Sequence, residues 1–168
     1  MTRVSIGRIL RHLMAPQWIA TRAFPRAALE RIEAAIKASE GAHRGEIRFV
    51  VEAALDLWPL LKGITPRERA LEVFSQLRVW DTQENSGILV YVQLIDHDIE
   101  IVADRGISAK VPQAEWDAIC CRMEETFRAR RYEQGVLRGI EEITALLIRH
   151  FPSRGINPDE LPDKPVVL

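Results

Sequence analysis

Features that would define a specialised class of protein are scarce in this sequence. Cysteine is nearly absent: the 168 residues include only two, Cys120 and Cys121, and these are adjacent. Since neighbouring cysteines cannot join distant parts of a chain, a disulfide framework is excluded and a reducing compartment fits. No apolar run approaches the roughly 20 residues that span a bilayer. We therefore expect a cytoplasmic protein, either free or peripheral to the inner face of the membrane.

Strong charge of either sign is also lacking. The formal net charge is −1 and the isoelectric point is about 6.4, so no global field would draw in nucleic acid. The four tryptophans are not interleaved with the basic residues that accompany base stacking. We expect no nucleic-acid partner. With 47% hydrophobic and 28% charged residues, the chain is typical of one ordinary globular domain.

The familiar catalytic motifs are missing as well. The sequence has no Gly-x-Ser-x-Gly elbow, no His-Glu-x-x-His zinc motif, no Gly-x-x-x-x-Gly-Lys phosphate loop and no dinucleotide-binding glycine fingerprint. Its four histidines lie far apart, without the spacing of metal ligands. No catalytic residue can therefore be assigned from a motif.

Residues 1–24 form a basic segment with an apolar stripe. Five arginines occur in the first 26 residues, and the first acidic residue is Glu30. Apolar side chains at three- and four-residue spacing predict a helix over residues 5–14. The residues of this stripe are Ile6, Ile9, Leu10, Leu13 and Met14. We favour docking of the stripe on the rest of the protein, and the alternative is attachment to an anionic membrane surface.

Hydrophobic patterns predict the elements of the main domain. Period-two runs rich in branched residues indicate strands, and apolar residues three or four apart indicate helices. A capping box from Thr65 to Glu68 marks the start of one helix. The expected strands cover residues 45–53, 87–95 and 99–103, and the expected helices begin near positions 25, 66, 112 and 132. The stretch between the first strand and the capping box is expected to be an apolar loop or a broken helical turn.

This order predicts an α/β fold, a three-layer α/β/α sandwich around a small mixed sheet. One strand–helix–strand crossover forms a right-handed unit, and a hairpin adds an antiparallel strand. The nearly continuous apolar run at 87–95 belongs at or near the centre of the sheet. We expect the domain to span residues 25–151. Four of the nine prolines crowd residues 152–168, which predicts an extended or mobile tail.

Two polar loops are candidates for a binding site. Residues 80–87 place two carboxylates, two amides and two hydroxyls before the central strand, a composition that suits a hard cation such as calcium or magnesium. If this loop meets the polar cluster at the end of the hairpin, Asp81, Glu84 and Asp104 come together. The alternative is a solvated loop whose small residues only permit a tight backbone.

Several short motifs occur together in this chain. They are a strand start at Gly45-Glu46-Ile47, the loop and strand Asn85-Ser86-Gly87-Ile88-Leu89-Val90, the hairpin end Ala103-Asp104-Arg105-Gly106, and Phe127, Tyr132, Gly135 and Gly139 near the last two helices. From Pro25 to Phe151 this pattern resembles the TPM domain, a family of plant thylakoid-lumen proteins and many bacterial proteins.

The resemblance implies a divalent-metal-binding fold and, for the plant branch, acid phosphatase activity. The metal ligands it implies, for calcium or magnesium, are Asp81, Glu84, Asn85 and Asp104. The implied phosphate or ligand contacts are Arg105 and Ser86. Asn85 stands where the family has an aspartate, so one anionic ligand is lost. We expect a non-catalytic or weakly metal-binding interaction module with an unknown protein partner; the alternative is a metal-dependent acid phosphatase acting on phosphate monoesters.

Overall fold

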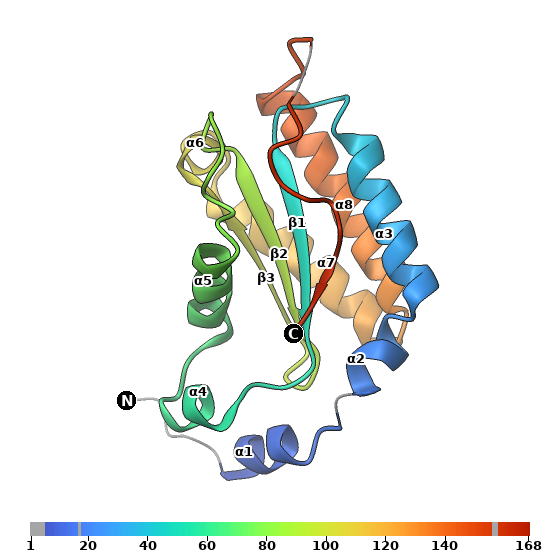
Figure 1. Ribbon diagram of the computed structural model, residues 1–168, viewed down its shortest axis with the longest axis vertical. Helices are drawn as coiled ribbons and strands as arrows, with labels where there is room; N and C mark the ends of the chain where they lie inside the picture. The colour runs from blue at the N-terminus through green and yellow to red at the C-terminus, as the bar shows by residue number, and fades with distance from the viewer. Residues whose placement is uncertain (1–5, 17, 156–157) are drawn as a thin grey trace.

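The computed structural model describes residues 6–16, 18–155 and 158–168, and its centre is an open mixed sheet with helices on both faces (Figure 1). The strand order is β3-β2-β1-β4. Strands β1 (Glu46–Glu52) and β2 (Gly87–Gln93) are parallel interior neighbours, and β3 (Asp98–Ala103) pairs antiparallel with β2. The predicted α/β sandwich is therefore confirmed, and the long apolar run lies inside the sheet.

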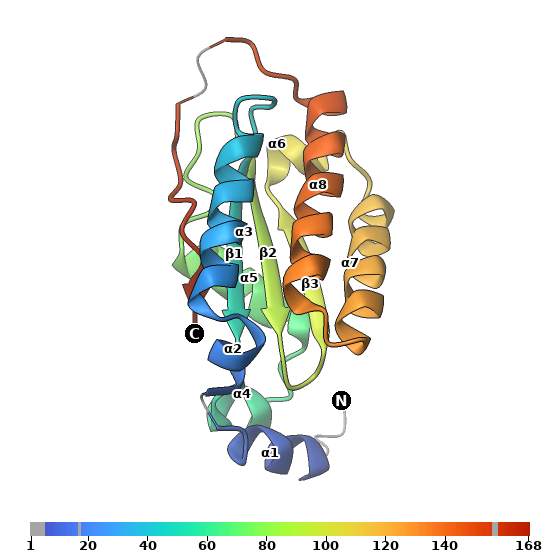
Figure 2. The ribbon, with the colours of Figure 1, turned by 90° about the vertical axis from the view of Figure 1, so that its right-hand side faces the viewer.

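The helices cover the two faces of the sheet unequally (Figure 2). Helices α3 (Arg26–Ser39), α7 (Gln113–Arg128) and α8 (Tyr132–His150) form one layer, and α5 (Pro66–Gln76) alone forms the other. Every residue of β1 and β2 is buried. Burial on both faces explains why these strands are nearly continuous in apolar residues rather than alternating.

Polar side chains define the start of α5 and hold it against the sheet. Its predicted capping box is present, since the Glu68 amide donates to Thr65 Oγ1 at 3.2 Å and the Thr65 amide donates to Glu68 Oε2 at 2.8 Å. At the end of β1, the Glu52 carboxylate accepts hydrogen bonds from Arg69 of α5 and from the Tyr91 hydroxyl of β2. One carboxylate therefore joins both interior strands to the covering helix.

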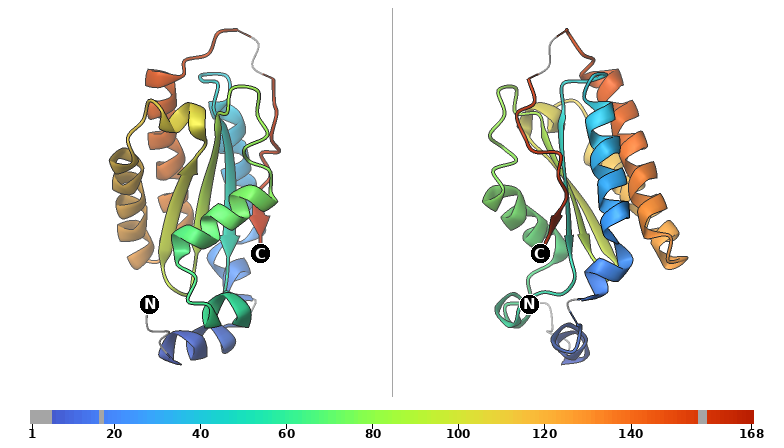
Figure 3. Two further views of the ribbon diagram at one scale, coloured as in Figure 1. Left: turned by 90° about the vertical axis from the view of Figure 1, so that its left-hand side faces the viewer. Right: turned by 45° about the vertical axis from the view of Figure 1, so that its right-hand side comes forward.

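The short helices divide between the two ends of the molecule. Helices α1 (Ile6–Leu13), α2 (Trp18–Ala23) and α4 (Leu57–Leu61) lie at the end where β1 and β2 finish (Figure 1). Helix α6 (Arg105–Ser108) lies at the opposite end, beside the loop that precedes β2 (Figure 3). Different helices therefore cover the two ends of the sheet.

The Pro-rich tail returns along the domain. After residue 157 it runs beside β1 and ends as β4 (Val166–Val167), which pairs parallel with β1 (Figure 3). The Leu168 amide donates to the Val51 carbonyl at 2.9 Å, and Leu161 is buried. The sheet therefore contains a fourth strand that the sequence patterns did not reveal, because it is only two residues long.

The favoured docking of the N-terminal apolar stripe is wrong. Helix α1 contacts the domain through its polar side, where Arg8 and His12 lie 2.8 and 3.1 Å from Asp96 of the β2–β3 turn. His12 Nδ1 also accepts the Leu55 amide at 2.9 Å. Because these polar contacts face inward, most of the stripe faces outward, and Ile6 is 75% exposed. Position 5, where the predicted helix begins, lies outside the described residues.

Replacing Gly87 with alanine should destabilise the fold strongly. An added Cβ at Gly87 would lie 1.8 Å from the Val79 carbonyl oxygen, so the backbone itself must move, whereas a Cβ at Gly41 meets nothing within 4 Å. We expect Gly87→Ala to lower the free energy of unfolding by about 2 kcal/mol or more, and Gly41→Ala to change it by less than about 1 kcal/mol. Urea denaturation measures both; equal effects would contradict the packing described.

Candidate functional site

The loop over residues 80–87 and the start of α6 meet at the amino end of β2. The Gly106 amide donates to the Asn85 carbonyl at 3.0 Å, and the Asp104 amide donates to the Gly87 carbonyl at 2.9 Å. Asn85 has a φ of 51°, and an added Cβ at Gly106 would lie 2.3 Å from the Glu84 carbonyl oxygen. Glycine at 106 is therefore required for this close approach.

Three of the predicted site residues are in contact here. Asp104 is 6% exposed, and its Oδ1 accepts the Arg105 amide at 2.7 Å as the cap of α6. Its Oδ2 is buried and has no hydrogen-bond partner among the described residues. The Arg105 guanidinium donates to Asn85 Oδ1 at 3.0 Å. The Arg105 side chain thus donates a hydrogen bond to the amide oxygen that would have to bind a cation.

The other predicted residues point elsewhere. Glu84 forms an ion pair with Arg44, Asp81 is exposed, and Ser86 is buried with its amide on Thr82 Oγ1. Within the part of the chain that the structure describes, the carboxylates of the predicted site do not form a group with oxygens within 4.8 Å of one another. The arrangement of the carboxylates around this loop is therefore poorly suited to binding a divalent cation. The metal site there stays a prediction.

A different acidic cluster lies nearby, and sequence reasoning missed it. Glu40 at the end of α3, Glu46 at the start of β1 and Asp159 of the tail bring carboxylate oxygens within 4.8 Å of one another. Glu46 is 1% exposed. The only sequence signal was a glutamate at the start of a buried strand, since the tail was not expected to pack beside it.

The environment of this cluster disfavours negative charge. Burial raises the pKa of Glu46 to about 7, against the hydrogen bond from the Leu161 amide, and the charge of Asp159 raises it further. Burial also raises the pKa of Glu40 to about 8, with a contribution from Asp163. Near neutral pH, these two carboxyl groups therefore hold protons that exposed carboxylates have lost.

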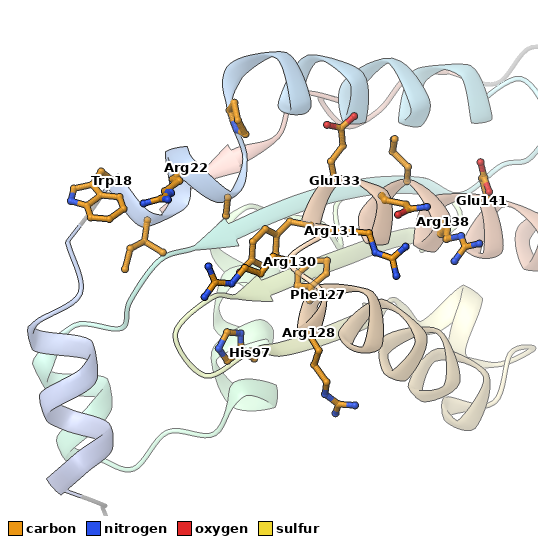
Figure 4. A pocket seen from close by; sticks show the side chains of 16 residues that line it. Trp18, Arg22, His97, Phe127, Arg128, Arg130, Arg131, Glu133, Arg138 and Glu141 are labelled. Atoms are coloured by element: carbon orange, nitrogen blue, oxygen red, sulfur yellow. The ribbon is translucent and has the colours of Figure 1, made fainter.

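An open groove lies at the opposite end of the molecule, between α2, the β2–β3 turn and the α7–α8 turn. It has a volume of about 1440 Å³, and Figure 4 shows arginines from several of these elements around it. Its basic and imidazole side chains are Arg22, His97, Arg128, Arg130, Arg131 and Arg138. Its apolar wall includes Trp18, Ile19, Phe127, Tyr132 and Leu137.

A tight turn gathers the arginines. Arg130 has a φ of 57°, and its amide donates to the Phe127 carbonyl at 2.7 Å, which reverses the chain between α7 and α8. Across the described ranges, Arg128, Arg130, Arg131 and Arg138 take part in no ion pair. The groove is thus a site of uncompensated positive charge. Three arginines within four residues of the sequence were the signal for it.

The groove has few acidic groups to offset its positive charge. Glu133 is neutralised from outside by an ion pair with Arg31. The Arg22 guanidinium lies 5.7 Å from the centre of the Trp18 ring, a cation–π distance. Glu141 is the remaining carboxylate among the lining residues. The positive charge of the groove therefore exceeds its negative charge.

Exposed apolar side chains concentrate at the same end. Eight of the thirteen large apolar side chains that are exposed among the described residues lie on or next to α1, α2 and α4. They are Ile6, Leu10, Leu13, Met14, Trp18, Leu57, Trp58 and Leu61. We call this set the apolar end. None of the described helices combines the length and apolar character needed to cross a bilayer.

A family model for the TPM domain matches residues 20–146. The chain belongs to the TPM domain family. The matched range holds β1, β2 and β3, the loop and most of the groove, but it leaves out α1 and the tail with Asp159 and β4. The apolar end and the acidic cluster therefore depend on segments outside the family match.

Solved structures agree with the TPM assignment. The chain is 29% identical to the BA42 protein of the psychrophilic bacterium Bizionia argentinensis, with a TM-score of 0.75 over 84% of this chain and 93% of that one. The N-terminal domain of a protein from P. gingivalis shares the fold, with 19% identity, a TM-score of 0.59 and coverage of 82% and 92%. No curated protein matches the chain.

The stability of this TPM domain should fall as the pH rises from about 5 to about 8 in metal-free buffer. The folded pKa of Glu46, about 7, exceeds the usual 4.5, so the folded state binds a proton that the unfolded chain has released. We expect a loss of up to about 3 kcal/mol from this group, since one pKa unit corresponds to about 1.4 kcal/mol.

The charge-neutral variant Glu46→Gln isolates this effect. Its urea-unfolding free energy should depend less on pH than that of the native protein, and it should be the more stable of the two at pH 8. Glu125→Gln, at an exposed position of α7, serves as the matched control. Parallel pH profiles for the native protein and Glu46→Gln would rule out the buried carboxyl as the cause.

Asn85→Asp should strengthen cation binding at the loop. The native protein, which has Asn85, should be a poor phosphatase. The substitution restores one negative charge beside Asp104, which we expect to tighten calcium or magnesium binding by about tenfold. The measurement is a titration followed by the amide shifts of residues 84–87, with Gln83→Glu as the charge-matched control. Robust turnover of a phosphate monoester by the native protein, abolished by Asp104→Ala, would contradict this expectation.

Proposed function

We propose that the chain is a non-catalytic interaction module of the TPM family that docks on an anionic lipid surface. The docking surface consists of the apolar end together with the arginine groove. The observation that carries the proposal is the presence, at one end of the molecule, of exposed large apolar side chains and unpaired arginines. A bilayer interface offers partners for both: acyl chains for the first and phosphates for the second.

The apolar part of the docking surface consists of side chains that are largely exposed to solvent. Met14 and Ile6 are 77% and 75% exposed, and Trp58 of α4 is 72% exposed. Helix α4 packs against α1, so their apolar side chains extend one surface rather than two separate ones. Contiguous exposed apolar groups of this kind mark interaction sites, and tryptophan is well suited to the headgroup region.

The basic component favours anionic phosphate. Guanidinium groups bind phosphate oxygens through paired N–H donors, and arginine is less strongly hydrated than lysine. Trp18 belongs to both the apolar end and the groove, so the two components are adjacent. Each basic residue close to an anionic surface contributes about 1 kcal/mol to binding. The expected cytoplasmic location would present the anionic inner leaflet to this surface.

The orientation of α1 supports the proposal. Asp96 accepts Arg8 Nε at 2.9 Å and lies within 3.1 Å of His12 Nε2, so the polar side of α1 is fixed against the β2–β3 turn. The Arg8 guanidinium is thereby neutralised by the domain itself. The apolar stripe remains on the outer side, where it can enter a lipid interface without unfolding α1.

A phosphatase function has less support from the geometry. Phosphoryl transfer needs a tightly held cation and positive side chains at one place. At the loop, Arg105 is bound to Asn85 and Arg44 is paired with Glu84. The unpaired arginines lie at the other end of the sheet (Figures 1 and 4). The two requirements of the reaction are thus separated by the length of the strands.

Co-sedimentation with lipid vesicles tests the proposed function. We expect the full chain to bind vesicles of 70% phosphatidylcholine and 30% phosphatidylglycerol, and to bind pure phosphatidylcholine weakly. Replacing Arg130 and Arg131 together by glutamine should reduce partitioning by about 30-fold, equivalent to about 2 kcal/mol at about 1 kcal/mol per residue. Trp58→Ser should reduce it by about tenfold because an interfacial anchor is lost.

Matched controls come from the rest of the surface. Leu71→Ser and Ile148→Ser change side chains that are 47% and 45% exposed but lie on α5 and α8, and Arg154→Gln changes an exposed arginine of the tail. All three should leave binding unchanged. Absence of vesicle binding, equal binding to neutral vesicles, or tight binding of a short RNA by the same arginines would each overturn the proposal.

A further inference from the structure

We infer that Glu40, Glu46 and Asp159 form a calcium site that fastens the C-terminal tail to the sheet. In the part of the chain that the structure describes, these three side chains bring potential metal-binding oxygens within 4.8 Å of one another. They come from the end of α3, the first residue of β1 and the returning tail. The site lies at the end of the molecule opposite the arginine groove, so it is independent of lipid docking.

Two oxygens in this cluster lack the partners that buried oxygens normally have. Glu46 is 1% exposed; its Oε2 accepts the Leu161 amide at 3.3 Å, while Oε1 has no partner among the described residues. Glu40 Oε1 is likewise buried without a partner there. A buried polar atom without a partner costs about 1–3 kcal/mol, and more when it is charged. A cation between the carboxylates supplies the missing interaction.

The protein places no positive side chain in the cluster. None of the ion pairs among the described residues involves Glu40, Glu46 or Asp159. The nearby Arg48 directs its guanidinium to backbone carbonyls of the tail, at Pro162 and Lys164. Once these carboxyl groups lose their protons, no side chain in the described ion pairs neutralises the cluster, and a cation can.

The oxygen donors favour calcium. Oxygen ligands without nitrogen or sulfur suit hard cations. The ligand atoms all lie within 4.8 Å of one another, so one ion can contact all three carboxylates. Calcium takes about six to eight oxygen ligands in flexible geometry, whereas magnesium requires a near-ideal octahedron and usually keeps several waters. Three carboxylates from three separate segments therefore suit calcium better than magnesium.

The site would join segments that are distant in sequence. Immediately after Asp159, the tail is held by Glu160, which accepts the Gln83 amide at 3.1 Å, and by Leu161, which is buried in the hydrophobic cluster between α5 and the sheet. The tail then reaches β4. A cation at Asp159 therefore stabilises the entry of the tail and, through it, the edge strand of the sheet.

Calorimetric titration of the full chain with calcium chloride at pH 8, after removal of metal with a chelator, tests the site. We expect saturable binding at one site, weakened at least 100-fold by Glu46→Gln and at least tenfold by Asp159→Asn. Glu125→Gln should bind as the native protein does. Magnesium should bind at least tenfold more weakly than calcium. Asp159 is exposed on the tail, so its variant tests the site even if Glu46→Gln fails to fold.

Amide chemical shifts identify where the ion binds. Calcium should shift the amides of Glu46, Leu161 and β4, and slow the hydrogen exchange of Leu168 by at least tenfold. The inference is overturned by the absence of saturable binding at millimolar calcium, by binding that survives both variants, or by shifts confined to residues 84–87. Magnesium binding as tight as calcium binding would overturn the choice of ion.

Discussion

Parallel pairing of β1 with β2 is the constraint on which the arrangement of this TPM domain depends. It places the segments that precede both strands at one end of the sheet and the segments that follow them at the other. Glu46 and the loop before Gly87 are thereby brought to the end with the acidic cluster, while the β2–β3 turn is brought to the end with the arginine groove. Burial of both strands makes this pairing the least accessible part of the protein. The acidic cluster and the arginine groove therefore lie at opposite ends of the sheet.

Asp96 has a comparable role for the surface that faces the proposed membrane. Burial alone would raise the pKa of this carboxyl, but the hydrogen bonds from Arg8 and His12 outweigh burial and lower it. The ionised carboxylate stabilises the docked helix, and this contribution is present above the ordinary carboxyl pKa of 3.8 and is lost as the pH falls through the lower folded value. This turn residue therefore helps to fix which side of α1 meets solvent, together with the Leu55 amide that His12 accepts.

The sequence predicted the elements whose causes are local. The capping box at Thr65, the buried strand from Gly87 and the family motifs around Gly106 all follow from neighbouring residues, and the layered fold follows from their order. It did not predict features that need partners far along the chain. Arg8 meets Asp96 across 88 positions, and the Leu161 amide meets Glu46 across 115. Amphipathic periodicity correctly indicated a helix in the first segment, but it could not show that a polar docking partner would turn the stripe outward.

Tryptophan fluorescence tests lipid docking through the apolar end. Trp58 and Trp80 are both exposed, at 72% and 48%, but Trp58 belongs to α4, at the end where β1 and β2 finish, whereas Trp80 belongs to the segment that precedes β2. Figure 1 shows α4 at that end of the sheet. Two proteins are compared, each retaining the buried Trp116 and only one of these two exposed tryptophans, the others being replaced by phenylalanine. On addition of anionic vesicles, the account predicts a blue shift of emission for the protein with Trp58 and none for the protein with Trp80. No shift in either protein, or a shift only with Trp80, would contradict it.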